Sequence, residues 1–298
     1  MIFHKPVLLK QSVNGLSVKS DGVYVDVTYG GGSHSKEILK KLSLKGKLFA
    51  FDHDEDAKFN ICSKNNFFFI YSNFKHLKKF LKLNDIYKVD GILADFGVSS
   101  HQLNSKERGF SIRFDGPLDM RMNQNQNLSA KDIINEYPEE KLIQLFKNYG
   151  ELKNGKQLAS IIGVQRSIAP ILSTKHFKSI FLNIIPKRHV NKTLAKIFQA
   201  IRIEVNKELD SIKSFLNQAS EVINPGGRLV CISYHSLEDR LVKRFIRDGN
   251  FNGNNNKDFF GNKNVPFKKI GKVQVPSNNE IKNNNRSRSA KLRIAEKL

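Results

Sequence analysis

Several residue types are scarce in this chain of 298 residues, and each scarcity narrows the class of protein it can be. The two cysteines, Cys62 and Cys231, are too few for a disulfide framework and lack the spacing of metal ligands. No apolar run approaches the roughly 20 residues that a membrane-spanning helix needs. The N-terminal residues do not have the pattern of a signal peptide. We therefore expect reduced cysteines, no metal, no membrane segment and a cytoplasmic protein.

Acidic residues are in deficit, with 28 Asp and Glu against 50 Lys and Arg and a formal net charge of +22. So basic a chain favours a polyanionic partner such as a nucleic acid. The absence of tryptophan and the abundance of Lys, Asn and Ile are also what an AT-rich genome produces, so part of the charge can be compositional. However, residues 263–298 contain ten Lys or Arg and only two Glu. We interpret this concentration as a basic C-terminal tail.

The chain does contain a series of apolar strands that alternate with helices. The predicted strands are residues 23–27, 47–51, 67–71, 89–94 and 228–232. Uninterrupted apolar strands of this kind are typical of a doubly wound, mostly parallel α/β sheet that is covered on both faces. Roughly 130 residues separate the last two strands, where a crossover needs only about a dozen, so an insertion is indicated.

The insertion has apolar residues at helical spacing and no strand pattern, and Ser129 has the type and position of a helix N-cap. We expect the first part of the α/β domain at residues 1–105, a helical substrate-recognition subdomain at 106–204, and the second part of the α/β domain at 205–298. An Asn-, Gly- and Lys-rich stretch at 249–264 is expected to be a mobile loop.

A glycine cluster at residues 30–32 follows the first strand and precedes a helix. Such a cluster can be a plain turn, but this order also builds nucleotide pockets at the carboxyl ends of strands. Asp52 ends the second strand about 20 residues on and suits ribose hydroxyls. Asp26 would repel a pyrophosphate and favour a sulfonium, and Ser35 departs from the dinucleotide pattern. S-adenosylmethionine therefore fits better than NAD, and a nicotinamide oxidoreductase is the weaker alternative.

Two further segments follow strand ends. Residues 95–122 begin with Asp95 and are dense in Gly, Pro and charge, which is poor core material. Their place at the pocket favours a substrate-contacting loop over a plain surface loop. After the fifth strand, His235 and Ser236 are expected near the same rim, with no paired nucleophile to indicate a hydrolytic triad.

Taken in order, these segments resemble the bacterial 16S ribosomal RNA cytosine-N4 methyltransferases, the MraW-like family. The matching blocks are residues 4–9, 26–35, 91–103, 108–122, 198–203, 226–240 and 286–293. The chain departs from the family pattern at Ser33, where glycine is usual, and at residues 192–197.

The resemblance implies a class I, S-adenosylmethionine-dependent methyltransferase with a Rossmann-like sheet and a helical insertion. Its implied substrate is a decoding-centre cytidine of 16S ribosomal RNA in the small subunit. The methyl donor would be held by Gly31, Gly32, Ser33, His34, Asp52, Phe74, Asp95 and Gln102. Our candidates for catalysis are Asp95, Asp119 and His235, and those for RNA contact are Arg108, Arg121, Ser236, Arg286 and Arg288.

A non-catalytic RNA-binding assembly factor with the same fold is the alternative function. The sequence leaves three questions open: whether the protein is a monomer or a homodimer, whether naked RNA or an assembled subunit is the substrate, and which group accepts the amine proton.

Overall fold

A computed structural model describes residues 6–253 and 265–298. His4, Lys5 and most of the expected loop at 249–264 lie outside the described residues. The chain forms two compact units, one from Met1–Gly97 with Leu209–Leu298 and the other from Val98–Glu208. We call these the sheet unit and the helical unit. The sequence pattern predicts junctions at 105/106 and 204/205.

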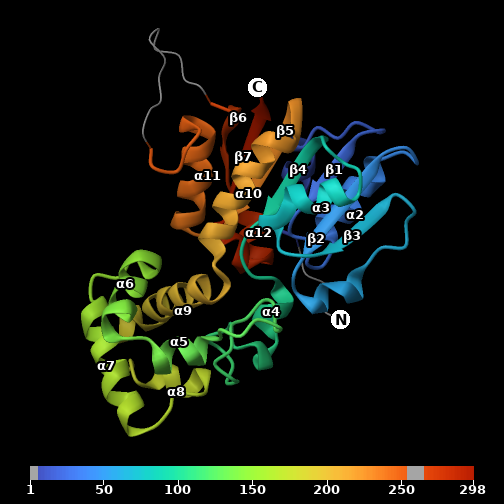
Figure 1. The fold of residues 1–298 in the computed structure, drawn as a ribbon. Coiled ribbons are helices and arrows are strands. Elements are labelled where there is room, and N and C mark those ends of the chain that lie inside the picture. The colour runs from blue at the N-terminus through green and yellow to red at the C-terminus, as the bar shows by residue number, and fades with distance from the viewer. Residues whose placement is uncertain (1–5, 254–264) are drawn as a thin grey trace. The chain divides into compact units, whose positions relative to one another are not determined.

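The sheet unit is organised around seven strands of the described chain, in the order β3-β2-β1-β4-β5-β7-β6 (Figure 1). They are β1 (Val23–Asp26), β2 (Lys47–Asp52), β3 (Phe67–Tyr71), β4 (Val89–Asp95), β5 (Ile223–Ser233), β6 (Phe267–Gln274) and β7 (Lys291–Lys297). Strands β1 to β5 pair in parallel, and β7 pairs antiparallel with both β5 and β6. The predicted doubly wound, mostly parallel α/β sheet is confirmed.

Neighbouring residues of each strand point to opposite sides of the sheet. Both faces therefore carry apolar side chains, and helices cover both. Leu48 packs in one core with α1 (Leu9–Gly15) and α2 (Ser33–Lys41). The next residue, Phe49, packs in the other core with α3 (Leu77–Leu83), α10 (Glu208–Val222) and α11 (Ser236–Asp248). The carboxyl ends of the parallel strands lie at one edge of the sheet, between these two cores, where strands of such sheets carry the polar side chains of ligand sites.

The C-terminal segment is folded into the sheet, which corrects the expectation of a basic tail. Strands β6 and β7 are joined through α12 (Asn278–Asn283) and the 3-10 helix η5 (Asn285–Ser289). Leu292 is 0% exposed, and Arg293 forms an ion pair with Asp239 of α11, with 2.7 Å from Nε to Oδ1. The expectation failed because it weighed charge alone, whereas Lys291-Leu292-Arg293-Ile294 alternates polar and apolar residues, as a strand with one buried face does.

The helical unit has a core of its own. Its helices of four residues or more are α4 (Ser100–Asn104), α5 (Ala130–Glu136), α6 (Glu139–Gly150), α7 (Gly155–Ile168), α8 (Thr174–Ser179) and α9 (Val190–Asn206). Ser129 is the N-cap residue of α5 as predicted, and its backbone N–H and hydroxyl both donate to Asp132 Oδ2 at 2.8 and 2.6 Å, which ties the cap to the first turn. Within the described residues, no helix combines the length and the apolar character needed to cross a membrane.

Replacing Leu292 by alanine tests whether β7 belongs to the core. Because its side chain is fully buried among the residues under α1 and α2, Leu292→Ala should lower the free energy of unfolding by about 2–5 kcal/mol. The matched control is Leu298→Ala, at a leucine that is 56% exposed, where the change should stay within about 0.5 kcal/mol. Equal effects in urea denaturation would contradict the placement of β7.

Candidate active site

The end of β1 leads into a tight glycine turn. Gly32 has a φ of 72°, and a Cβ there would lie 2.8 Å from the ring of Tyr29, so this position requires glycine. At Gly31, by contrast, no described atom lies within 4 Å of where a Cβ would be. The backbone at Gly31 is therefore open to a ligand. Ser33 and His34 follow as the first residues of α2.

The Asp52 carboxylate, at the end of β2, is hydrogen-bonded to this turn. Its Oδ2 accepts a hydrogen bond from the backbone N–H of Gly30, and its Oδ1 accepts one from that of Asp54, both at 2.8 Å. Burial raises the pKa of the Asp52 carboxyl. Each oxygen keeps a further lone pair, so the fixed carboxylate can accept hydrogen bonds from two vicinal hydroxyls.

An aromatic side chain follows the end of β3. Phe74 begins the 3-10 helix η2 (Phe74–His76) and is partly buried. Its ring centroid lies 5.6 Å from that of Phe215 and 6.0 Å from that of Phe96. The remaining exposed part of the ring is an apolar surface of the kind on which a purine can pack.

Polar contacts from three elements converge on Asp95 at the end of β4. Its backbone N–H donates to Thr28 Oγ1 at 2.7 Å, its Oδ1 accepts from the hydroxyl of Tyr234 at 2.8 Å, and its Oδ2 lies 3.8 Å from His34 Nδ1. Burial raises the pKa of Asp95 to about 6, against the opposing effects of His34 and Tyr234. At neutral pH this carboxyl is therefore mostly ionised yet close to its pKa, as a proton acceptor requires.

Asp26, the last residue of β1, stabilises this arrangement through buried hydrogen bonds. Its side chain is 0% exposed, accepts from Ser35 Oγ at 2.7 Å and from the backbone N–H of Thr28 at 3.1 Å, and has its pKa raised by burial to about 6. The sequence suggested a carboxylate facing the ligand. The structure instead makes Asp26 a buried charge that ties the turn and α2 to β1.

The segment after β5 contributes Tyr234, which the sequence reasoning missed as a site residue. Burial and the nearby Asp95 hold the pKa of Tyr234 well above its ordinary value, so its hydroxyl stays a donor. The signal that could have found it is its position directly after an apolar strand and next to His235. His235 itself caps α11, because its Nδ1 accepts from the backbone N–H of Glu238 at 3.4 Å, and Ser236 is the first, exposed residue of that helix.

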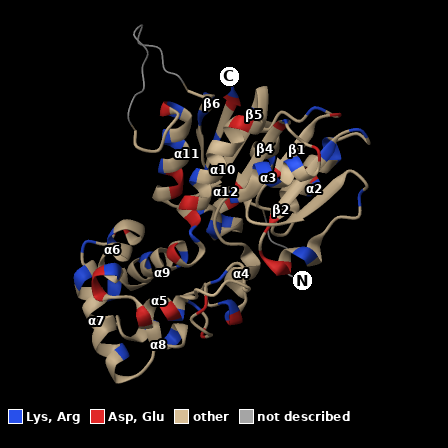
Figure 2. Ribbon diagram, in the orientation of Figure 1, with Lys and Arg blue, Asp and Glu red and all other residues tan. Residues whose placement is uncertain are grey.

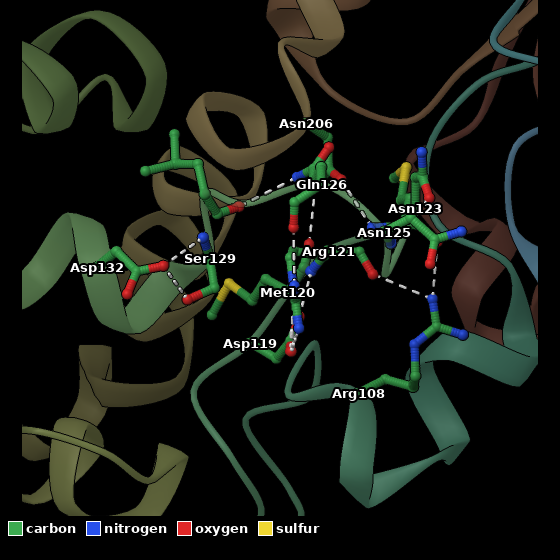
Figure 3. Close-up of polar contacts among 12 residues, drawn as sticks. Arg108, Asp119, Met120, Arg121, Asn123, Asn125, Gln126, Ser129, Asp132 and Asn206 are labelled. Carbon is green, nitrogen blue, oxygen red and sulfur yellow. Dashed lines mark hydrogen bonds and ion pairs between the residues drawn. The ribbon is translucent and has the colours of Figure 1, made fainter.

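The helical unit brings together three of the predicted residues, and they bind one another (Figure 3). Arg121 pairs with Asp119, with 2.8 Å from Nη2 to Oδ2 and 3.0 Å from Nε to Oδ1. Arg108 is 4% exposed, and its Nη2 donates to the carbonyls of Arg121 and Met122, at 3.0 Å each. Arg108 thus shapes the loop from inside, which the sequence reasoning did not foresee.

The remaining predicted residues lie in α4 and η5. Gln102 is 4% exposed in α4, where its Oε1 accepts from the backbone N–H of Ser99 at 2.9 Å as part of a capping box. Arg286 and Arg288 are exposed in η5 of the sheet unit.

The residues at the strand ends of the sheet unit fit an adenosyl sulfonium compound. Asp52 suits a ribose diol, Phe74 suits an adenine, and the backbone is accessible at Gly31. The buried charge of Asp26 and Asp95 favours a cation over a phosphate. In addition, His34 Nε2 is buried and has no hydrogen-bond partner among the described residues, so a polar group is needed beside it.

The chain matches the model of the MraW methylase family over residues 1–298. It is 57% identical over 298 residues to the ribosomal RNA small subunit methyltransferase H of Christiangramia forsetii, covering 100% of this chain and 99% of that protein. The enzymes of the same name from Flavobacterium johnsoniae and Bacteroides fragilis are 56% and 52% identical, over 100% and 99% of this chain and 99% and 97% of theirs.

Replacing Asp26 by asparagine should change how stability depends on pH. The pKa of Asp26 is about 6 in the folded protein and near 3.8 when unfolded, so the folded state binds this proton more tightly. The stability that the group contributes is fully present below pH about 4 and is lost as the pH rises through about 6, a loss of about 3 kcal/mol.

Urea denaturation at pH about 4 and about 7.5 measures this effect. Asp26→Asn should lose less stability than the wild type over that interval. The matched control is Asp210→Asn, which removes an exposed carboxylate from the same unit. If Asp26→Asn follows the wild-type pH dependence, the assignment of a raised pKa to Asp26 is wrong.

Proposed function

The chain belongs to the MraW methylase family, whose methyl donor is S-adenosylmethionine, and from this premise we propose that it methylates N4 of a decoding-centre cytidine in 16S ribosomal RNA. The observation that carries the proposal is the set of groups at the strand ends: the hydrogen-bonded Asp52 carboxylate, the open backbone at Gly31 and the buried Asp95 carboxyl, whose pKa is raised to about 6. The names of the relatives and the charge of +22 support a small-subunit RNA as the substrate.

The donor-binding residues divide by chemistry. When bound, S-adenosylmethionine supplies a methyl group on a positively charged sulfur. The Asp52 carboxylate accepts hydrogen bonds from its ribose hydroxyls, Phe74 packs against its adenine, and the backbone from Gly31 to His34 follows its contour. The assignment of Gln102 to donor binding is proposed on the family resemblance alone.

Asp95 is the proposed proton acceptor. The exocyclic amine of cytosine is a weak nucleophile because its lone pair is delocalised into the ring, so transfer requires alignment of the amine and removal of a proton. Tyr234 occupies Asp95 Oδ1, which leaves Oδ2, on the side of His34, to take that proton. His235 holds the start of α11 in place, so that Ser236 is presented to the target nucleotide.

RNA contact is proposed for the exposed Ser236, Arg286 and Arg288, and for the loop that carries the Asp119–Arg121 pair. Extruding the target base from its helix costs a few kcal/mol, which phosphate contacts can offset.

Tritium transfer from labelled S-adenosylmethionine to small-subunit RNA, followed by nucleoside analysis, tests the function directly. The expected product is N4-methylcytidine at a single position. Label in another nucleoside would refute the N4 assignment. Donor and RNA binding without any transfer would favour the non-catalytic assembly factor.

Asp95→Asn should reduce kcat by roughly 100-fold or more, because a positioned base contributes at least that much, and should leave RNA affinity nearly intact. In the wild type, kcat should rise with pH through about 6 as Asp95 loses its proton. The hydrogen bond from Tyr234 lowers the pKa of Asp95, so Tyr234→Phe should move this midpoint upward. Equal losses of turnover and RNA affinity in Asp95→Asn would show that Asp95 is structural.

A further inference from the structure

A groove of about 170 Å³ lies between helix α11 and the edge of the sheet formed by β6 and β7. Five basic residues line it: Lys243 and Arg247 from α11, Lys269 and Lys272 from β6, and Arg293 from β7. No acidic residue is among its described lining residues. All of these elements belong to the sheet unit, and Figure 2 shows basic segments on α11 and at β6.

Two of the five cations are neutralised within the fold. Arg247 pairs with Asp248, with 2.6 Å from Nη2 to Oδ2, and Arg293 pairs with Asp239. Lys243, Lys269 and Lys272 are exposed, and the described part of the chain offers none of them a carboxylate within ion-pair distance. The groove therefore has an excess of positive charge that calls for an external anion.

Protection of a sheet edge explains only part of this charge. Strand β6 is the outer strand of the sheet, and lysines on such a strand discourage pairing with another chain. That accounts for Lys269 and Lys272, and it also disfavours a peptide that would add a strand to β6. It does not account for Lys243, which reaches the same groove from a helix.

The floor of the groove is aliphatic. Ile246, Ile270 and Val273 are part of its lining, and Val273 is 40% exposed. A duplex would present only its phosphates and sugars here and leave this floor uncovered. Single-stranded RNA presents phosphates together with unstacked bases that can cover apolar surface.

We propose that this groove binds a single-stranded segment of the RNA substrate, with phosphates at Lys243, Lys269 and Lys272 and a base over the aliphatic floor. The inference rests on the proposed function for the identity of that RNA. The groove is built from residues other than those of the donor site, so it acts on RNA affinity and not on the transfer step.

The triple variant Lys243→Gln, Lys269→Gln, Lys272→Gln tests the groove. Its matched control is Lys45→Gln, Lys47→Gln, Lys82→Gln, which removes the same charge from exposed lysines near β2 and α3, toward the opposite edge of the sheet. RNA affinity is measured by filter binding over a range of salt concentrations. The slope of log K against log salt is negative, and each lost single-strand phosphate contact should make it less steep by about 0.7, so the slope of the groove variant should be shallower by about 2.

At physiological salt the KM for RNA should rise roughly 10-fold or more in the groove variant, while kcat and S-adenosylmethionine affinity stay unchanged. A second variant, Val273→Asp, keeps the lysines and should weaken binding by placing a like charge beside the phosphates. Thermal unfolding of each variant should match the wild type.

Equal losses in the groove variant and its control would overturn the proposal, as would a duplex that competes as well as a single strand of the same length. If the wild type transfers no methyl group to 16S RNA, the proposed function fails instead, and the salt slopes still decide whether the groove binds RNA.

Discussion

The contacts that converge on Asp95 are the constraint on which this site depends. Thr28, from the β1 turn, accepts from the backbone N–H of Asp95, whereas Tyr234, from the end of β5, and His34, from α2, contact its carboxyl, so this one residue joins three elements. Asp26 accepts a hydrogen bond from the backbone N–H of Thr28, and its charge raises the pKa of Asp95 further. Two buried carboxyls with pKa values near 6 lower the free energy of unfolding at neutral pH. Such a loss of stability is typical of functional sites, where the charged group has a role. The same network that positions Asp95, the proposed acceptor, also holds the glycine turn after β1.

The two units carry different parts of the chemistry. The sheet unit holds, on strand ends, the groups that we propose to bind the nucleoside and to accept the proton, and backbone hydrogen bonds of the sheet fix their positions. In the helical unit the loop after Arg108 is organised by its own polar residues: Arg108 bonds its carbonyls, and Asn206 donates to the carbonyl of Met120 at 2.8 Å. A loop held in this way presents a defined surface although it contains no regular element beyond short turns. Its charged residues therefore bind other groups of the loop, and a ligand would contact the surface that these bonds stabilise.

The sequence predicted those parts of the site whose positions follow from neighbouring residues along the chain. The glycine turn, Asp52 and Asp95 each follow an apolar strand, so their place at one edge of a parallel sheet followed from the strand pattern. The bond between Tyr234 and Asp95 spans 139 residues of chain and depends on β5 lying next to β4, which no local pattern states. The burial of Arg108 and Asp26 likewise depends on tertiary packing, because charged residues are ordinarily exposed. Strand β7 was missed although its alternation is local, because its charged residues dominated the interpretation.

The C-terminal strands also show why a count of charges does not locate a binding surface. Of the basic residues there, Arg293 is neutralised by Asp239 on α11, and Glu296 on β7 in turn neutralises Arg228 on β5. The lysines of β6 lie on the outer strand of the sheet, where among the described residues only one side has a neighbouring strand. Sheet order therefore selects which cations stay available to a partner, and a helix beside that edge adds Lys243 to them. A tail with the same composition would offer its charge without a fixed geometry. At this edge the lysines instead have fixed positions beside an apolar floor. That combination of fixed charge and apolar surface distinguishes a nucleic-acid groove from a merely basic surface.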